Sequence, residues 1–233
     1  MKKASGKIFY GKAYLYFSVA AIVTVLAFFP SYFNRLTETD GAHHFHGITA
    51  TLWILLLVVQ PFLYQAGKFD WHRKLGKVSF VLVPLIIISA LNMVHVMLSG
   101  DSYSPGLAYR LAFIDFFTLI QFLLFFLLAI VYRHNIQLHA RYMACTVLGP
   151  MIPALTRLFF RIPLIDNFDK SLNASYILID IVLLILLVDD KRSGKIRSPY
   201  VLAFILMAIQ HVLMNFVAQW EWWRVLMDAF SRL

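Results

Sequence analysis

Three histidines, His46, His95 and His211, lie within long apolar stretches of this chain. Neutral imidazole is the commonest metal ligand in proteins, and paired imidazoles also hold haem iron. His43 stands three residues before His46, a spacing that puts both rings on one helix face and suits chelation of one ion. We therefore predict a metal site formed by His43, His46, His95 and His211. The alternative for each single histidine is a hydrogen-bonded place in the core.

Asp115, Asp180 and Arg157 also fall within apolar stretches. A charge at the centre of a membrane helix costs about 2.5 to 3.5 kcal/mol, so such groups pair or line a wet cavity. We expect Asp115 or Asp180 to pair with Arg157, and either carboxylate to activate a metal-bound water if the site is hydrolytic. Arg161, one turn further on, would contact the propionates of a haem. A structural salt bridge between helices is the alternative.

A second group of candidate ligands comes from basic segments. His72 lies in the run Trp71-His72-Arg73-Lys74-Leu75-Gly76-Lys77, and His139 stands just before a later span. If the two rings face each other, they can bind a second cofactor. We expect Asp70 to cap the helix that contains His72, and Gly76 to allow a neighbouring helix to approach closely.

The elements that carry these residues are membrane helices. Hydrophobic residues make up 61% of the 233 residues and charged residues 14%, a composition typical of a multi-pass membrane protein. The chain predicts an all-α single domain, residues 1–233, built as a bundle of seven transmembrane helices, with a short interfacial segment at about 219–233. Pro150 and Pro153 should interrupt the fifth span. The expected spans are Tyr14–Phe33, Phe45–Tyr64, Val78–Leu98, Leu107–Tyr132, Arg141–Phe160, Tyr176–Val188 (extending back towards Leu172) and Tyr200–Ala218.

Basic residues set the expected orientation. The amino terminus, with Lys2, Lys3, Lys7 and Lys12, and the loops 65–77, 133–141 and 190–197 carry fourteen of the twenty-one Lys and Arg residues. The positive-inside rule puts these segments in the cytoplasm and the carboxyl terminus outside. The net charge of +9 then indicates anionic lipid headgroups as partners of the cytoplasmic loops, and not nucleic acid.

This orientation brings the polar residues to a similar depth. Asp115 and Asp180 each lie about 12 Å into their spans from the outer side, because a helix rises 1.5 Å per residue. Six helices send a polar side chain to the outer half of the bilayer. The tryptophans after the seventh span should lie in the outer aromatic belt and form a short surface helix: Trp220, Trp222 and Trp223.

Two motifs carry a resemblance to known proteins. His43-x-x-His46-Gly47 at the start of a span, followed by His72-Arg73-x-Leu75-Gly76, resembles a group of uncharacterised bacterial multi-pass membrane proteins. The His-Arg-x-Leu-Gly element is loosely similar to ferric-reductase-like and b561-like cytochromes. The resemblance implies a bacterial inner membrane and paired histidines that hold haem b.

Three functions remain open. The first is a redox protein that binds haem b or a transition metal (Zn, Cu or Fe) near the outer leaflet, with His46, His95, His211, His72, His139 and Arg161 as cofactor-binding residues. The second is an intramembrane zinc-dependent hydrolase of a lipid-like substrate, with Asp115, Asp180 and Arg157 as catalytic residues, although no His-Glu-x-x-His motif occurs. The third is an ion- or proton-coupled transporter, sensor or oxidase assembly factor. The single Cys145 excludes an intrachain disulfide and a Cys-rich zinc site.

Overall fold

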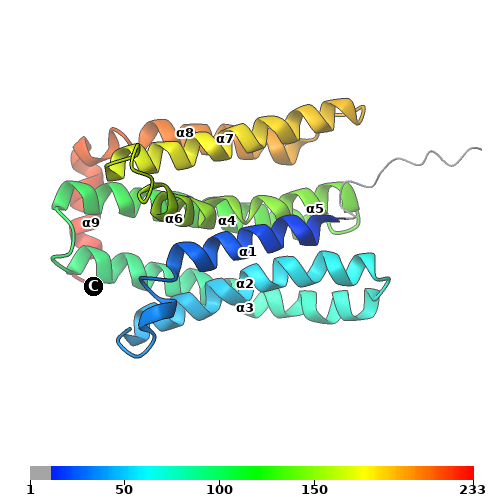
Figure 1. Ribbon diagram of the computed structural model, residues 1–233, viewed down its shortest axis with the longest axis horizontal. Coiled ribbons are helices and arrows are strands. Elements are labelled where there is room, and N and C mark those ends of the chain that lie inside the picture. Colours follow the sequence, from blue (N-terminus) through cyan, green and yellow to red (C-terminus); the bar gives the residue numbers. More distant parts are fainter. Residues whose placement is uncertain (1–11) are drawn as a thin grey trace, which may run out of the picture.

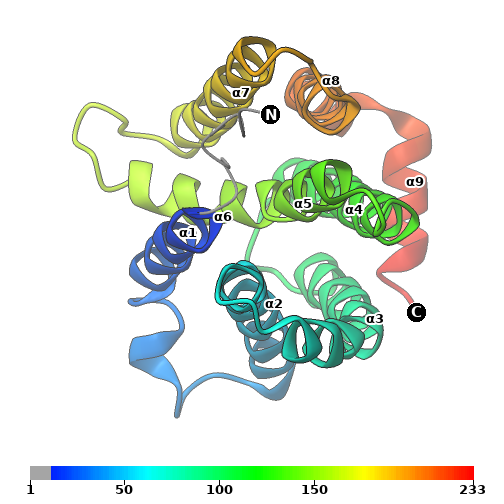
Figure 2. The ribbon, with the colours of Figure 1, turned by 90° about the vertical axis from the view of Figure 1, so that its right-hand side faces the viewer.

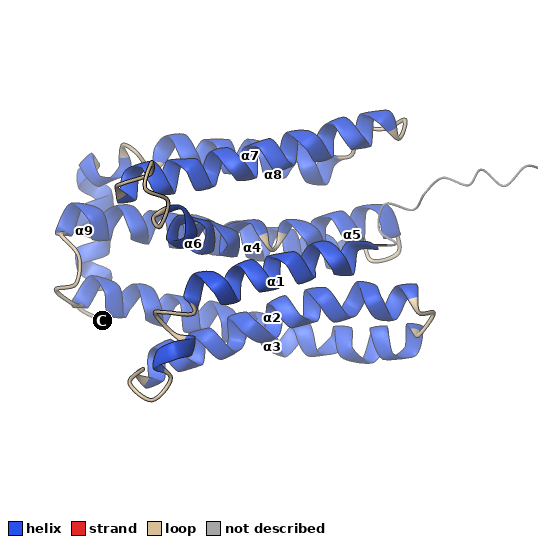
Figure 3. Cartoon of the chain, in the orientation of Figure 1, coloured by secondary structure: helices blue, strands red, loops and turns tan. Residues whose placement is uncertain are grey.

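The fold is that of a computed structural model, which describes residues 12–233. Lys2, Lys3 and Lys7 of the basic start lie outside the described residues. The described chain is helical and contains no strand (Figures 1 and 3). Its α-helices are α1 (Ala13–Phe28), α2 (Gly41–Gln65), α3 (Phe69–Ser99), α4 (Pro105–Val131), α5 (Ile136–Cys145), α6 (Leu148–Phe159), α7 (Phe168–Arg192), α8 (Ser198–Leu213) and α9 (Glu221–Phe230).

Helices α1 to α5, α7 and α8 run roughly along the long axis of the molecule, α6 is strongly inclined to it (Figure 2), and α9 crosses the bundle at one end (Figure 1). Viewed along the axis, α4 and α5 lie in the centre, with α7 and α8 on one side and α2 and α3 on the other (Figure 2). Helix α1 packs on α2 and α6, and α6 also packs on α7. The central position of α4 brings it into contact with α3, α5, α6, α8 and α9.

Five helical rods are long and apolar enough to cross a membrane: α2, α3, α4, the rod made of α5 and α6, and α7. Helices α1 and α8 are apolar but have 16 residues each. When α5 and α6 are counted as one bent rod, the described residues form eight helices and not the seven predicted for the bundle. The eighth, α9, occupies the segment expected to be interfacial.

Helices α3 and α7 begin before the apolar spans predicted for them, because their first turns are polar. Helix α7 begins at Phe168, where the Asn167 side chain caps it by accepting a hydrogen bond from the Lys170 N–H at 2.8 Å. Helix α3 begins at Phe69, so Asp70 lies inside its first turn and is not the cap. A carboxylate in this turn still interacts favourably with the positive end of the helix dipole.

The fifth span is broken, as Pro150 and Pro153 predict, but the break lies before both of them, at Thr146 and Val147. A proline ring clashes with the carbonyl four residues earlier, which for Pro150 is that of Thr146. The Thr146 N–H accordingly bonds to the Met143 oxygen at 3.2 Å, three residues back.

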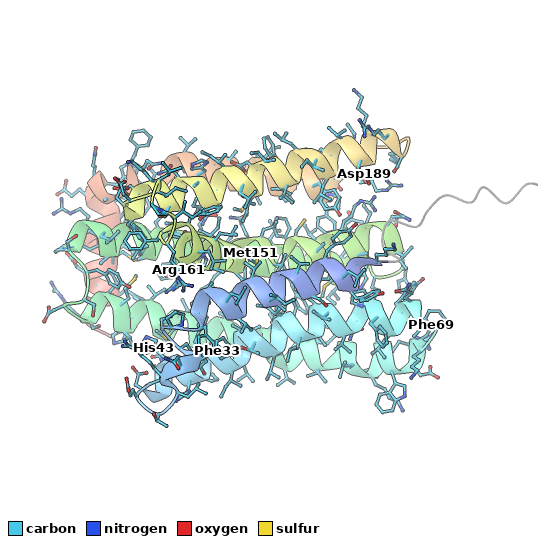
Figure 4. The ribbon with its side chains drawn as sticks, viewed as in Figure 1. Phe33, His43, Phe69, Met151, Arg161 and Asp189 are labelled. Carbon is cyan, nitrogen blue, oxygen red and sulfur yellow. The ribbon has the colours of Figure 1, made fainter. Side chains whose placement is uncertain are left out.

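The loops divide into a basic end and an opposite end. The basic end consists of loops 66–68, 132–135 and 193–197, which lie together in Figure 1. The opposite end consists of connections 29–40, 100–104, 160–167 and 214–220 together with α9. In Figure 4, Phe69 and Asp189 lie towards the basic end, and His43 and Phe33 towards the opposite end. Gln60 and Gly76 show the close approach of α2 and α3 near the basic end, since a Cβ on Gly76 would lie 3.7 Å from the Gln60 amide nitrogen.

Polar bonds join the helices at mid-depth. The Trp53 indole of α2 donates to the Thr146 hydroxyl at the break in the fifth span, over 3.3 Å. The Gln121 amide of α4 donates to the Gln210 side-chain oxygen of α8 over 2.8 Å, and both residues are buried. Such bonds fix the rotation of each helix about its axis, because an unpaired amide in an apolar core is costly.

Helix α9 is amphipathic and packs across the ends of α3 and α4. Trp223 and Met227 are buried, and the Trp223 indole donates to the Tyr109 carbonyl over 2.9 Å. Tyr109 in turn donates to Asp228 over 2.7 Å. Trp222, in contrast, is 61% exposed, so only some of the tryptophans predicted for an aromatic belt face outward.

Candidate functional site

The three histidines that were predicted to lie within membrane spans are found in three different helix interfaces. The His46 Nδ1 is 3.3 Å from the Ser89 hydroxyl, between α2 and α3. The His95 Nδ1 is 3.3 Å from the Phe230 carbonyl, between α3 and α9. The His211 ring lies between α7 and α8. Across residues 12–233, no three His, Cys, Asp or Glu side chains are grouped so that they could hold a metal ion.

His43, predicted as a further metal ligand, points to Asp40 instead. Asp40 caps α2 by accepting the His43 N–H at 2.9 Å, and its second oxygen is 2.7 Å from the His43 ring. The bond from the His43 backbone, and then the one from its ring, hold the pKa of Asp40 below its ordinary value of 3.8. Both side chains are exposed. His43 therefore helps to start the helix.

His211 has the most polar surroundings of the three. Its Nδ1 is 3.4 Å from Asp180 Oδ2, and its Nε2 is 3.1 Å from Asn173 Oδ1. The ring stacks on Tyr176, with centroids 4.9 Å apart and an angle of 15° between the planes. Asn173, Tyr176 and Asp180 follow one another at steps of three and four along α7, so a single helix face presents all three to α8.

The hydrogen-bond pattern around His211 is complete only when the His211–Asp180 pair carries one additional proton. The Asn173 amide nitrogen donates to the Asp169 carbonyl over 2.8 Å, which turns its oxygen towards His211. Both nitrogens of His211 therefore face acceptor oxygens, while a neutral imidazole donates from only one nitrogen. The contacts are all satisfied when either the imidazole or the Asp180 carboxyl carries one additional proton. Without it, one ring nitrogen faces an acceptor oxygen with its lone pair: Nε2 faces Asn173 when Nδ1 carries the proton, and Nδ1 faces Asp180 when Nε2 carries it.

Around this pair, several polar atoms are buried without a hydrogen-bond partner. Within the described residues these include Asp180 Oδ1, the Tyr176 hydroxyl and Arg110 Nε. Arg110 is also ion-paired with Asp169 and donates to Asn215 over 3.0 Å. Unpaired buried polar groups are uncommon and mark places where water, an ion or a ligand belongs. We call this set the α4–α7–α8 cluster: Arg110, Asp115, Asp169, Asn173, Tyr176, Asp180, His211 and Asn215.

The predicted ion pair of Arg157 with a carboxylate does not form. Asp115 lies close enough to Arg157 to interact electrostatically, but the described residues contain no ion pair between them. The Arg157 guanidinium instead lies over the Phe28 ring, 4.4 Å from its centroid, and donates to the Pro153 carbonyl over 3.0 Å. A guanidinium that stacks on an aromatic face keeps a favourable contact without a carboxylate.

Arg161, predicted to contact propionates, caps a helix. Its guanidinium donates to the carbonyls of Leu26 and Ala27, at 3.4 and 3.2 Å, at the end of α1. The last carbonyls of a helix lack partners inside the helix, and a cation there also interacts favourably with the helix dipole. Figure 4 shows Arg161 beside α6, from which it reaches α1.

At the basic end, His72 and His139 lie close enough to interact electrostatically. The Nδ1 of His72 is 3.3 Å from the Gln60 carbonyl of α2, and that of His139 is 2.8 Å from the Ala129 carbonyl of α4. Because a carbonyl is only an acceptor, both rings carry their proton on Nδ1. Among residues 12–233, their Nε2 atoms have no hydrogen-bond partner.

Sequence reasoning missed a buried ion pair at the basic end. The Arg141 and Asp190 side chains are 4% and 1% exposed, and Arg141 Nε donates to Asp190 Oδ1 over 3.0 Å. Asp190 also accepts the Arg197 N–H at 3.2 Å. It thus joins α5, α7 and the start of α8. Arg141 had been counted only as a basic residue at the end of loop 133–141, and Asp190 had not been considered.

Sequence reasoning also missed three residues that complete the α4–α7–α8 cluster: Tyr176, Asn173 and Arg110. Their signal was present in the sequence, because Asp169, Asn173, Tyr176 and Asp180 share one helix face. The pattern is visible only if α7 begins at Phe168.

The comparisons with known proteins add no assignment. No family model, no curated protein and no solved structure matches this chain.

Proposed function

We propose that this chain is an integral membrane protein that binds and releases a proton at His211 and Asp180, as a proton-coupled carrier or sensor. The observation that carries the proposal is the placement of two acceptor oxygens, Asp180 Oδ2 and Asn173 Oδ1, on the two nitrogens of one imidazole. This arrangement is complete only with an additional proton, and intramembrane carboxylate–histidine pairs are characteristic of proton pathways.

Loss of that proton would act on the packing of α7 against α8. Deprotonation leaves one ring nitrogen with its lone pair opposite an acceptor oxygen, either Asn173 Oδ1 or Asp180 Oδ2, and that contact changes from attraction to repulsion. Tyr176, stacked on the same ring, would move with it. A local charge change coupled to the contact between two helices is how proton-driven carriers and sensors are switched.

Haem or metal chemistry at the outer site receives less support, because its expected donors do not gather. His46, His95 and His211 have partners in separate interfaces. Three orphaned polar atoms, Asp180 Oδ1, the Tyr176 hydroxyl and Arg110 Nε, lie instead in the α4–α7–α8 cluster, where water or a hydrated proton would satisfy them.

The proposal includes seven crossings of a bacterial inner membrane by α1 to α8, in which α5 and α6 together make one crossing. The basic end lies on the cytoplasmic side, and α9 lies on the outer surface. The alternation of basic and non-basic connections supports this orientation. Single cysteines for labelling with a membrane-impermeant maleimide, placed at Gly194 and Leu164 in a Cys145→Ala background, test it. Intact cells should be labelled at position 164 and not at 194; the reverse pattern would contradict the orientation.

Proton binding is tested by a pH jump on the purified protein in weakly buffered detergent, with an indicator dye that reports proton release. The wild-type chain should release one proton more than the Asp180→Asn variant across the titration of the pair. Asp189→Asn is the matched control, because it removes a carboxylate from α7 and leaves the α4–α7–α8 cluster unchanged. If Asp180→Asn and wild type release protons identically at every pH, the proposal fails.

A further inference from the structure

A second binding site lies at the basic end, apart from the α4–α7–α8 cluster. Its starting point is the Gln60 side chain of α2, whose amide nitrogen and oxygen are both buried without a hydrogen-bond partner. A buried primary amide with no partner is unfavourable, because it has lost its bonds to water and gained none in return. Such a group therefore indicates a ligand or water that the protein atoms alone do not supply.

Two imidazoles adjoin this amide. His72 is tied to the backbone oxygen of Gln60. Gly76, one turn after His72 on the same face of α3, lies beside the Gln60 amide, because a Cβ there would be 3.7 Å from its nitrogen. The absence of a side chain at Gly76 leaves this space open. His139 of α5, which interacts electrostatically with His72, completes the group.

The tautomers of the two rings suit metal binding. Metal-ligating histidines donate one ring N–H to a carbonyl or carboxylate, which orients the ring and makes the other nitrogen the ligand. His72 and His139 both do this through Nδ1, with the carbonyls of Gln60 and Ala129. Their Nε2 atoms, which have no hydrogen-bond partner in the described part of the chain, are left as the ligating atoms.

We propose that His72 Nε2 and His139 Nε2 bind a divalent transition-metal ion of the zinc class at the basic end. The Gln60 amide either ligates the ion through its oxygen or holds a water bound to it. Imidazole nitrogens prefer Zn²⁺, Cu²⁺ and Ni²⁺ to Mg²⁺ or Ca²⁺. The remaining positions belong to water or an exchangeable ligand, as in zinc sites that keep an open position.

This site does not depend on the proposed proton binding, since it involves none of the same residues. Its position, among the first turns of α3 and α5, makes a metal ion a clamp between α2, α3 and α5. Ion binding should therefore raise the thermal stability of the folded protein, because a ligand that binds only the folded state stabilises it.

The test uses the full-length protein in mild detergent, stripped with a chelator and titrated with Zn²⁺ by calorimetry, then with Co²⁺ by visible absorption. Wild type should bind one equivalent with a rise in Tm, and bound Co²⁺ should show ligand-field bands. His72→Gln and His139→Gln should each weaken binding by at least about tenfold. Gln60→Leu should weaken it less.

His134→Gln is the matched control, because His134 is an exposed histidine in the loop just before α5. It should bind Zn²⁺ as wild type does, and size-exclusion elution and circular dichroism establish that each variant is folded. The proposal is overturned if folded His72→Gln and His139→Gln retain wild-type affinity, or if His134→Gln loses as much affinity as they do.

Discussion

Replacing the buried Asp190 with alanine should destabilise the bundle far more than the loss of an exposed charge. The Asp190 side chain is 1% exposed and accepts hydrogen bonds from Arg141 Nε and Nη2 and from the Arg197 backbone. Its removal leaves a guanidinium that is 4% exposed without its carboxylate. Breaking a buried ion pair from one side costs about 3 to 5 kcal/mol.

The structure places the effect at the lower end of that range. Arg141 Nη1 keeps its bonds to the Gln137 carbonyl and side-chain oxygen, at 3.0 and 2.7 Å, after Asp190 is lost. We therefore expect a loss of about 3 kcal/mol in the free energy of unfolding, which is roughly a 100-fold change in the unfolding equilibrium. Reversible unfolding by SDS in mixed micelles, followed by circular dichroism, measures it.

Asp189→Ala is the control, since Asp189 precedes Asp190 on α7 and makes no ion pair among the described residues. It should change the free energy by less than about 0.5 kcal/mol. The double variant Arg141→Met, Asp190→Leu should lose less than Asp190→Ala alone, because no buried charge is left uncompensated. An Asp190→Ala protein as stable as Asp189→Ala would refute the assignment of a buried ion pair.

Two further predictions concern packing and pH. A methyl group added by Gly149→Ala would lie 2.3 Å from the Thr118 methyl, so we expect the free energy of unfolding to fall by about 1 to 3 kcal/mol in the same SDS assay. Adding Thr118→Ser to this variant should restore most of the lost stability. A Gly149→Ala protein as stable as wild type would contradict the close contact of α4 and α6. Because the pKa of Asp40 is lowered in the folded state, its contribution to stability is present above pH 3.8 and is lost as the pH falls through the lower folded value. The carboxyl carbon shift of Asp40 should titrate below 3.8 in wild type and move upward in His43→Ala; a wild-type midpoint at or above 3.8 would show that the cap does not form.

The helical architecture could be predicted from the sequence because apolar runs of about twenty residues leave few alternatives. The fifth span illustrates both the strength and the limit of such reasoning. Pro150 and Pro153 predicted an interruption, and one occurs, but its position depends on the carbonyl four residues before Pro150. The eighth helix, α9, was expected as a surface segment, and its docking through Trp223 depends on the tertiary contact with Tyr109.

The site could be predicted only in part, because depth along a helix does not fix the direction of a side chain. His46, His95 and His211 come from the same half of the bundle, but rotation of their helices turns them into three interfaces. Asp180 was identified, whereas its partners Asn173 and Tyr176 were missed because the start of α7 was placed too late. Arg141 and Asp190 were missed because charges at span ends are usually solvated.

The proton shared by His211 and Asp180 is the central claim, and infrared difference spectroscopy tests it most directly. Spectra of the protein in lipid vesicles, recorded between acidic and alkaline pH, report the carboxyl and imidazole bands of the pair. We predict coupled changes, in which imidazole bands of His211 and carboxyl or carboxylate bands of Asp180 appear at one midpoint, and both vanish from that midpoint in Asp180→Asn. If the imidazole and carboxyl bands titrate independently, or persist unchanged in Asp180→Asn, the pair does not share a proton and the proposed function is wrong.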